Sequence, residues 1–162
     1  MDKRLEKALN DQVNSEHQAA LVYTQLAYEM DNLSMTGMRD WFAAQAEEER
    51  EHAERFAKHL MDRGYRVELT TIELPPVKAA TALDAFEAAL AHEKHVSEQI
   101  RQIARIADEV KDLDSRGLIN DFLDEQVEEE ATVSEIIDRL KLVGNDGSGL
   151  LRIDAGLGQR QP

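Results

Sequence analysis

The sequence predicts an all-α fold, in which four long helices form a bundle, a long crossover joins the second helix to the third, and a short fifth helix follows. Two observations carry this prediction. Glycine and proline are scarce within long segments rich in Ala, Leu, Glu, Lys, Arg and Gln, which favour helices. The segment after Gly64 is instead rich in β-branched residues and ends in Pro75 and Pro76, so it is expected to be extended.

The four long helices are expected at about 4–33, 36–63, 82–110 and 115–143. Residues Asn32 to Gly37 break the first pair, and residues Asp112 to Gly117 break the second. The extended connection between Gly64 and Thr81 can reach ~60 Å, whereas each long helix is about 42 Å long. The connection can therefore run the length of the bundle, so that the two middle helices are parallel.

The end of the chain is expected to hold the short fifth helix, near Ser148 to Ala155. The chain is accordingly divided into a four-helix bundle, residues 1–145, and a C-terminal helix and tail, residues 146–162. No internal repeat and no second domain are expected.

The composition excludes several classes of function. Asp and Glu number 33 against 19 Lys and Arg, which argues against a nucleic-acid partner and suits a surface that concentrates cations. The absence of cysteine excludes disulfides, zinc knuckles, iron–sulfur clusters and thiol catalysis. The first residues form no signal peptide, and no apolar run approaches the roughly 18 residues of a membrane span. We therefore expect a cytoplasmic protein with no membrane partner.

Each long helix carries a glutamate near the middle of its inward-facing stripe. Apolar residues recur at spacings of three and four along the four helices, and the glutamates within these stripes are Glu16, Glu49, Glu93 and Glu129. A wrong helix phase could place any one of them in solvent. It is a poor explanation for all four, because large apolar residues flank each glutamate and an unpaired buried carboxylate costs several kcal/mol.

Two further side chains join these glutamates in a pattern that suits metal ions. His52 lies three residues after Glu49, and Gln126 lies three residues before Glu129, so each pair shares one helical face. Two divalent cations would neutralise the four carboxylates. Oxygen-rich ligation with one imidazole suits iron or manganese better than structural zinc, and so small a ligand set leaves positions open for oxygen or water. The pattern predicts a di-metal centre in the core.

At these motifs the chain resembles the bacterial non-haem ferritins. The matching segments are residues 9–16, 47–52, 92–93 and 125–130, and the resemblance covers nearly the whole chain. It implies a ferritin-like four-helix bundle, a fold in which two helices each give a Glu and two others each give a Glu-x-x-His motif. Here the fourth helix offers Gln126-Val127-Glu128-Glu129 instead, as in non-haem ferritins and unlike bacterioferritins.

The resemblance also implies the ligands of two iron ions: Glu16, Glu49 and His52 at the first, and Glu93 and Glu129 at the second, with Gln126 close by. Glu49 would bridge the two ions. Tyr23 matches the family's tyrosine beside the site, although a core tyrosine with a satisfied hydroxyl explains it equally well.

The reaction that the resemblance implies is that of a ferroxidase, the oxidation of Fe(II) by oxygen or hydrogen peroxide. The product would be stored as ferric mineral inside a 24-mer cage of identical subunits. No haem is expected, because Arg50 stands where bacterioferritins carry the methionine that ligates haem iron.

A third, weaker iron site is expected outside the central pair. Glu48, Glu125 and Glu128 each lie one residue before an inward position, so all three are turned about 100° in the same sense. They converge if the second and fourth helices are neighbours, and the resemblance points to a third iron at matching positions. A solvated acidic surface is the alternative.

Two other functions remain open from the sequence. One is a non-storage di-iron or di-manganese oxidase of the same fold, and the other is a metal-free helical interaction protein with its acids at the surface. Among the remaining histidines, His17, His92 and His95 are expected at the surface, and His59 is expected to be a satisfied polar residue.

Overall fold

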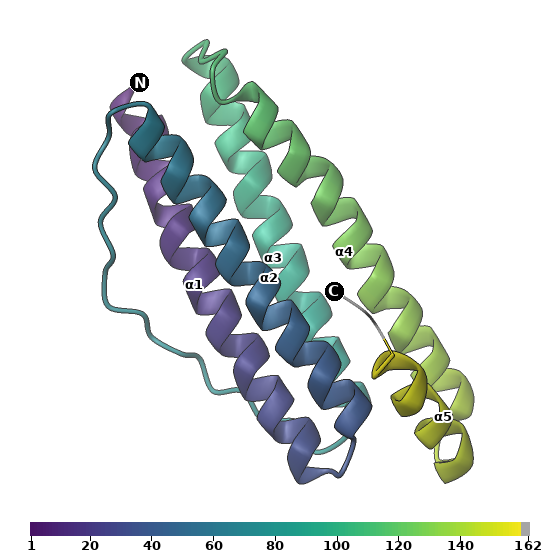
Figure 1. The fold of residues 1–162 in the computed structure, drawn as a ribbon. Coiled ribbons are helices and arrows are strands. Elements are labelled where there is room, and N and C mark those ends of the chain that lie inside the picture. The colour runs from purple at the N-terminus through teal and green to yellow at the C-terminus, as the bar shows by residue number, and fades with distance from the viewer. Residues whose placement is uncertain (160–162) are drawn as a thin grey trace.

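The computed structural model describes residues 1–159, and all the regular structure within them is helical (Figure 1). The helices are α1 (Lys3–Asn32), α2 (Thr36–Asp62), α3 (Ala82–Glu109), α4 (Arg116–Val143) and α5 (Gly147–Leu157). The predicted bundle, the long crossover and the fifth helix are confirmed, and the ends of the long helices differ from the prediction by at most one residue. Residues 160–162 of the expected tail lie outside the described part of the chain.

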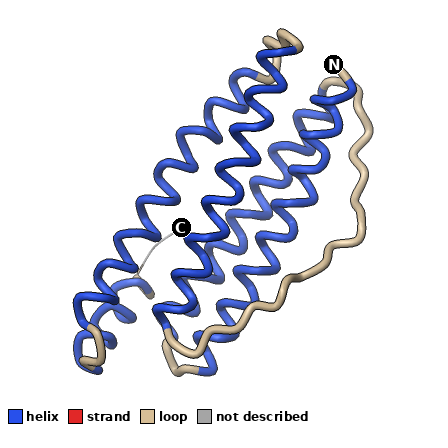
Figure 2. The backbone as a smooth tube through the Cα atoms, turned by 180° about the vertical axis from the view of Figure 1, so that it is seen from behind, coloured by secondary structure: helices blue, strands red, loops and turns tan. Residues whose placement is uncertain are grey.

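The crossover runs alongside α1 from the end of α2 to the start of α3, so α2 and α3 are parallel, as predicted (Figures 1 and 2). Side-chain amides on α1 hold it in place. Asn10 accepts from the Glu68 amide at 2.8 Å and donates to the Glu68 carbonyl at 3.0 Å. One turn later Asn14 accepts from the Thr70 amide at 2.8 Å. These contacts satisfy backbone groups that no sheet or helix would otherwise satisfy.

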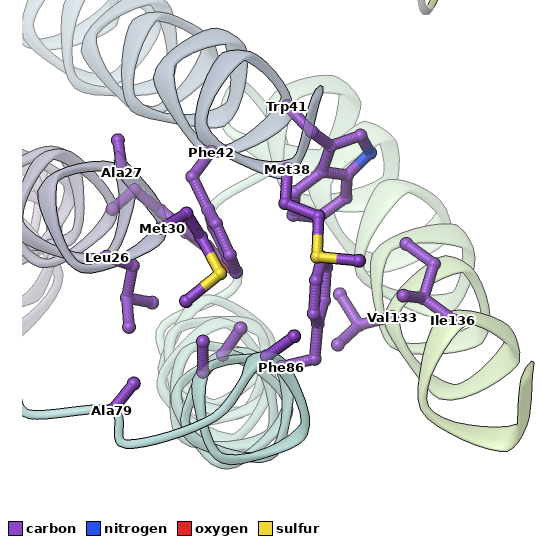
Figure 3. Close-up of a cluster of buried hydrophobic side chains, with 14 of the residues drawn as sticks. Leu26, Ala27, Met30, Met38, Trp41, Phe42, Ala79, Phe86, Val133 and Ile136 are labelled. Carbon is purple, nitrogen blue, oxygen red and sulfur yellow. The ribbon is translucent and has the colours of Figure 1, made fainter. Parts of the chain in front are cut away.

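Two apolar clusters fill the bundle, one toward each end. The first surrounds Phe42, Phe86 and Trp41 (Figure 3). The second surrounds Phe56 and Phe122, whose rings stack with centroids 4.2 Å apart. Between the clusters lies a group of buried polar side chains that we call the polar layer: Glu16, Glu49, His52, Glu93, Gln126 and Glu129.

The helix α5 packs against the beginning of α2. The residue before α2, Met35, offers no side chain to cap the helix, and Asp154 of α5 supplies the acceptor instead, at 2.8 Å from the Met38 amide. The two backbones touch at Gly37, where an added Cβ would lie 1.8 Å from the Asp154 carbonyl oxygen. Among residues 1–159 no helix is both long and apolar enough to cross a bilayer.

Candidate metal centre

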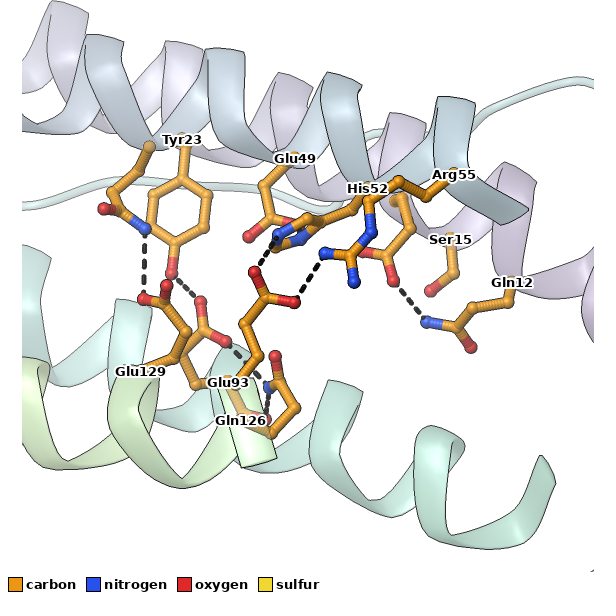
Figure 4. Close-up of polar contacts among 12 residues, drawn as sticks. Gln12, Ser15, Tyr23, Glu49, His52, Arg55, Glu93, Gln126 and Glu129 are labelled. Carbon is orange, nitrogen blue, oxygen red and sulfur yellow. Dashed lines mark hydrogen bonds and ion pairs between the residues drawn. The ribbon is translucent and has the colours of Figure 1, made fainter. Parts of the chain in front are cut away.

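The polar layer receives side chains from all four long helices, and each of its six residues is buried. The phase predicted for each helix is therefore confirmed, and the alternative with these four glutamates at the surface is wrong. The layer lies midway along the bundle because each glutamate stands near the middle of an apolar stripe. Figure 4 shows the labelled side chains converging between the helices.

Three of the predicted ligands form one compact group. Single ligand atoms of Glu16, Glu49 and His52 lie within 4.8 Å of one another, which is close enough to hold one ion together. The Nδ1 atom of His52 is 3.3 Å from Glu49 Oε2. On α1, Gln12 donates to Glu16 Oε1 at 2.7 Å, while Glu16 Oε2 is buried and accepts no hydrogen bond. That unused oxygen is a donor atom available to a cation.

The other predicted ligands are engaged by neutral donors instead. The Tyr23 hydroxyl donates to Glu93 Oε1, and Gln126 Nε2 donates to Glu93 Oε2 at 3.1 Å. Gln45 Nε2 donates to Glu129 Oε2 at 3.2 Å. Glu93 and Glu129 therefore stand beside the compact group without joining it. They are held by groups that a second cation could displace.

Without cations, the buried carboxylates are poorly accommodated as anions. Burial, followed by the nearby Glu49 carboxylate, raises the pKa of Glu16 well above its ordinary value. Burial also raises the pKa of Glu49 and of Glu93. Burial alone would lower the pKa of His52, but Glu125 and Glu49 outweigh it and raise this pKa to about 11. The layer therefore favours bound positive charge, whether protons or metal ions.

A second group lies at the rim of the layer, between α2 and α4. Ligand atoms of Glu48, His52 and Glu125 lie within 4.8 Å of one another, so the expected convergence of Glu48 and Glu125 is confirmed. We call these three residues the outer group. Glu128 was expected there too, but it is exposed and does not join the group. Three residues advance around a helix by about 300°, so the Glu128 side chain points ~60° away from that of Glu125.

Sequence reasoning missed the residue that holds Glu125. Arg55 donates from Nη1 to Glu125 Oε2 at 2.7 Å, and its guanidinium lies 4.1 Å from the centre of the Phe122 ring. Glu125 Oε1 is meanwhile 3.2 Å from His52 Nε2. The hydrogen bond from His52, followed by that from Arg55, outweighs burial and lowers the pKa of Glu125 to about 2. Glu125 is therefore an anion fixed at both oxygens.

Of the four histidines outside the layer, two lie in the environment that was expected and two do not. His92 was expected at the surface, but it is half-buried, and its ring meets Tyr23 edge-on with centroids 6.0 Å apart. Burial, with the charge of His95, lowers its pKa to about 4. His17 is also half-buried, whereas His95 is exposed as expected. The expectation for His59 is confirmed, since its Nε2 lies 2.9 Å from Ser115 Oγ.

The chain and its fold are similar to those of known ferritins. The family model described as a ferritin-like domain matches residues 6–143. A bacterial non-heme ferritin of Staphylococcus aureus (strain MRSA252) is 35% identical over 160 residues, which are 99% of this chain and 96% of that protein. A bacterial non-heme ferritin of Staphylococcus haemolyticus is 36% identical over the same shares of the two chains. A solved open pore ferritin of the archaeon Archaeoglobus fulgidus superposes with a TM-score of 0.97 at 34% identity, covering 99% of each chain.

Proposed function

Because the chain belongs to the ferritin family, we propose that it stores iron and that its polar layer oxidises Fe(II) to Fe(III) before storage. The observation that carries the oxidation step is the burial of four carboxylates from four helices around one imidazole. So much buried negative charge is unfavourable unless cations bind to it. Iron is the substrate of this centre and passes through it.

The ligand roles follow from the geometry and the family resemblance together. Glu16, Glu49 and His52 receive the first Fe(II), since they already form a compact group. Glu93 and Glu129 receive the second, after their amide and hydroxyl partners give way, with Gln126 beside them. Two Fe(II) ions supply the two electrons that reduce one O₂, with two protons, to hydrogen peroxide. Hydrogen peroxide can itself accept two electrons from a second pair of ions.

The outer group is proposed as a third and weaker site. Glu48 and Glu125 supply carboxylate ligand atoms beside the Nε2 side of His52, and Glu128 lies one turn further along α4. The outer group is less buried than the compact group. Its carboxylate Glu125 is already paired with Arg55. Both facts support weaker binding than in the polar layer.

Storage of a mineral requires assembly, because one four-helix subunit encloses no space large enough for it. We propose a closed 24-mer cage without haem. Arg50, which stands at the place of the bacterioferritin methionine, is exposed and paired with Glu47. Size-exclusion chromatography of the purified protein should give a cage-sized particle, and its absorbance should lack a Soret band. Elution as a monomer or dimer, or a strong Soret band, would refute this part.

The oxidation step is tested by replacing Glu49, the carboxylate that the family resemblance gives as the bridge between both ions. Glu49→Ala should abolish the fast phase of Fe(II) oxidation in air, followed by absorbance after rapid mixing. Glu51→Ala is the matched control, because Glu51 is exposed on the same helix. Fast oxidation at the wild-type rate in Glu49→Ala would overturn the assignment. A resident di-metal oxidase would differ by retaining stoichiometric metal through purification and forming no mineral.

A further inference from the structure

Arg55 lies one helical turn after His52 on α2 and contacts Glu125 of the outer group, and the function proposed above uses it only as a competitor for that carboxylate. Its guanidinium is held on two sides. Glu125 accepts from it at 2.7 Å, and the Phe122 ring lies 4.1 Å beneath it. Phe122 is itself stacked on Phe56, so the aromatic surface under Arg55 belongs to the apolar cluster. Stacking of this kind fixes the orientation of an arginine more firmly than an exposed ion pair does.

His52 is shared between the two groups through its two ring nitrogens. The Nδ1 atom faces Glu49, and the Nε2 atom faces Glu125. A histidine that ligates a metal through one nitrogen usually donates its other N–H to a carboxylate, which orients the ring and sharpens its affinity. While Glu125 accepts from Nε2–H, His52 presents Nδ1 to the compact group. Glu125 can instead turn to a cation in the outer group, but only by giving up this role.

We propose that Arg55 is a positioning residue that makes the polar layer fill with iron before the outer group. Its guanidinium holds Glu125 against His52, which orients the imidazole toward the compact group. The same contact occupies Oε2 of Glu125, so this carboxylate has one oxygen fewer to offer a cation in the outer group. Arg55 thus strengthens the inner site and weakens the outer site with one ion pair. The inference rests on the proposed function, since it assumes that both groups bind Fe(II).

The test is a stepwise anaerobic titration of the assembled protein with Co(II). This divalent ion can be detected without oxygen. Calorimetry gives the affinity and stoichiometry of each step, and the visible absorbance of Co(II) reports ligation by His52. Arg55→Met removes the charge and the donors while keeping a long apolar side chain. Arg55→Lys keeps the charge without the planar fork. Arg50→Met, on the same helix and paired with Glu47 at the surface, is the matched control.

In the wild type we expect two tight steps, the first with the spectrum of an imidazole-bound ion, then one weaker step. In Arg55→Met the inner affinity should fall about tenfold, the low end for loss of a second-layer partner, and the outer affinity should rise. Arg55→Lys should lie between, and Arg50→Met should match the wild type.

Identical stepwise affinities in Arg55→Met and the wild type would overturn the inference while leaving the proposed function intact. Absence of the two tight steps in the wild type would overturn both. Because Arg55 also packs on Phe122, each variant is first checked for helicity and cage size. If Arg55→Met does not assemble, Arg55→Lys still tests the inference. Wild-type affinities at every step in Arg55→Lys would show that the planar guanidinium is not needed.

Discussion

The contact between α2 and α5 makes Gly37 the glycine least able to accept a side chain. We predict that Gly37→Ala displaces α5 from the bundle. The new Cβ would lie 1.8 Å from the carbonyl oxygen of Asp154 and 3.0 Å from the amide nitrogen of Gly158. Both are backbone atoms, so no side-chain rotation can relieve the clash. The helix α5 must move away by more than an ångström before ordinary contact distances return.

The cost of this movement has three parts. Crowding of a well-packed contact typically costs about 1–3 kcal/mol. Loss of the hydrogen bond from the Met38 amide to Asp154 removes the cap of α2, worth about 1 kcal/mol. Alanine gains up to about 1 kcal/mol over glycine within a helix. The last two effects nearly cancel, so the free energy of unfolding should fall by about 1–3 kcal/mol per subunit.

Chemical denaturation followed by circular dichroism measures this loss, and limited trypsin digestion at Arg152 of α5 reports the displacement directly. Gly117→Ala and Gly156→Ala are matched controls, because an added Cβ at either position meets nothing within 4 Å. Each should be neutral or slightly stabilising. Wild-type stability together with wild-type protection of Arg152 in Gly37→Ala would refute the steric argument.

Three further predictions concern single side chains. Tyr23→Phe removes the hydroxyl that the second Fe(II) must displace from Glu93, so anaerobic calorimetry should show tighter binding of the second Fe(II) than in the wild type. Glu48→Ala should remove only the weakest Fe(II) binding step in calorimetry, and the exposed Glu128→Ala should not. Asp112→Ala should cost about 2 kcal/mol in denaturation at pH 7, because Arg63 holds the pKa of this carboxyl below its ordinary value despite burial. Because the folded-state pKa is lowered, this contribution is complete above the unfolded value, near pH 4, and is lost as the pH falls further through the lower folded-state pKa.

The fold could be predicted from the sequence because the signals that begin and end its helices are local. Helix formers fill each long segment, and glycine, proline or a polar turn ends it, so the boundaries were correct to within a residue. The crossover followed from Pro75, Pro76 and the length of the connection. The packing of α5 on Gly37 could not be predicted, since it depends on a contact between residues 116 positions apart, Met38 and Asp154.

The candidate site was predictable only where the helical repeat decides which way a side chain points. The inward glutamates follow from spacing alone. Arg55 was missed because its role depends on the axial alignment of α2 with α4, which no single-helix pattern contains. His92 was expected at the surface because it precedes an inward residue, yet that direction leads toward Tyr23 of α1 rather than to solvent. Gln12 carried a usable signal, standing one turn before Glu16.

The position of the polar layer between two apolar clusters also specifies the register of the bundle. A slide of one helix by one turn, about 5.4 Å, would move its glutamate toward the aromatic rings of one cluster. Apolar stripes alone tolerate such a slide, whereas a buried carboxylate taken away from its partners costs several kcal/mol. A single buried asparagine aligns the helices of a coiled coil by the same means. The residues proposed to bind iron therefore also exclude misaligned folds, so replacing them all with apolar residues should leave a bundle with more than one helix alignment.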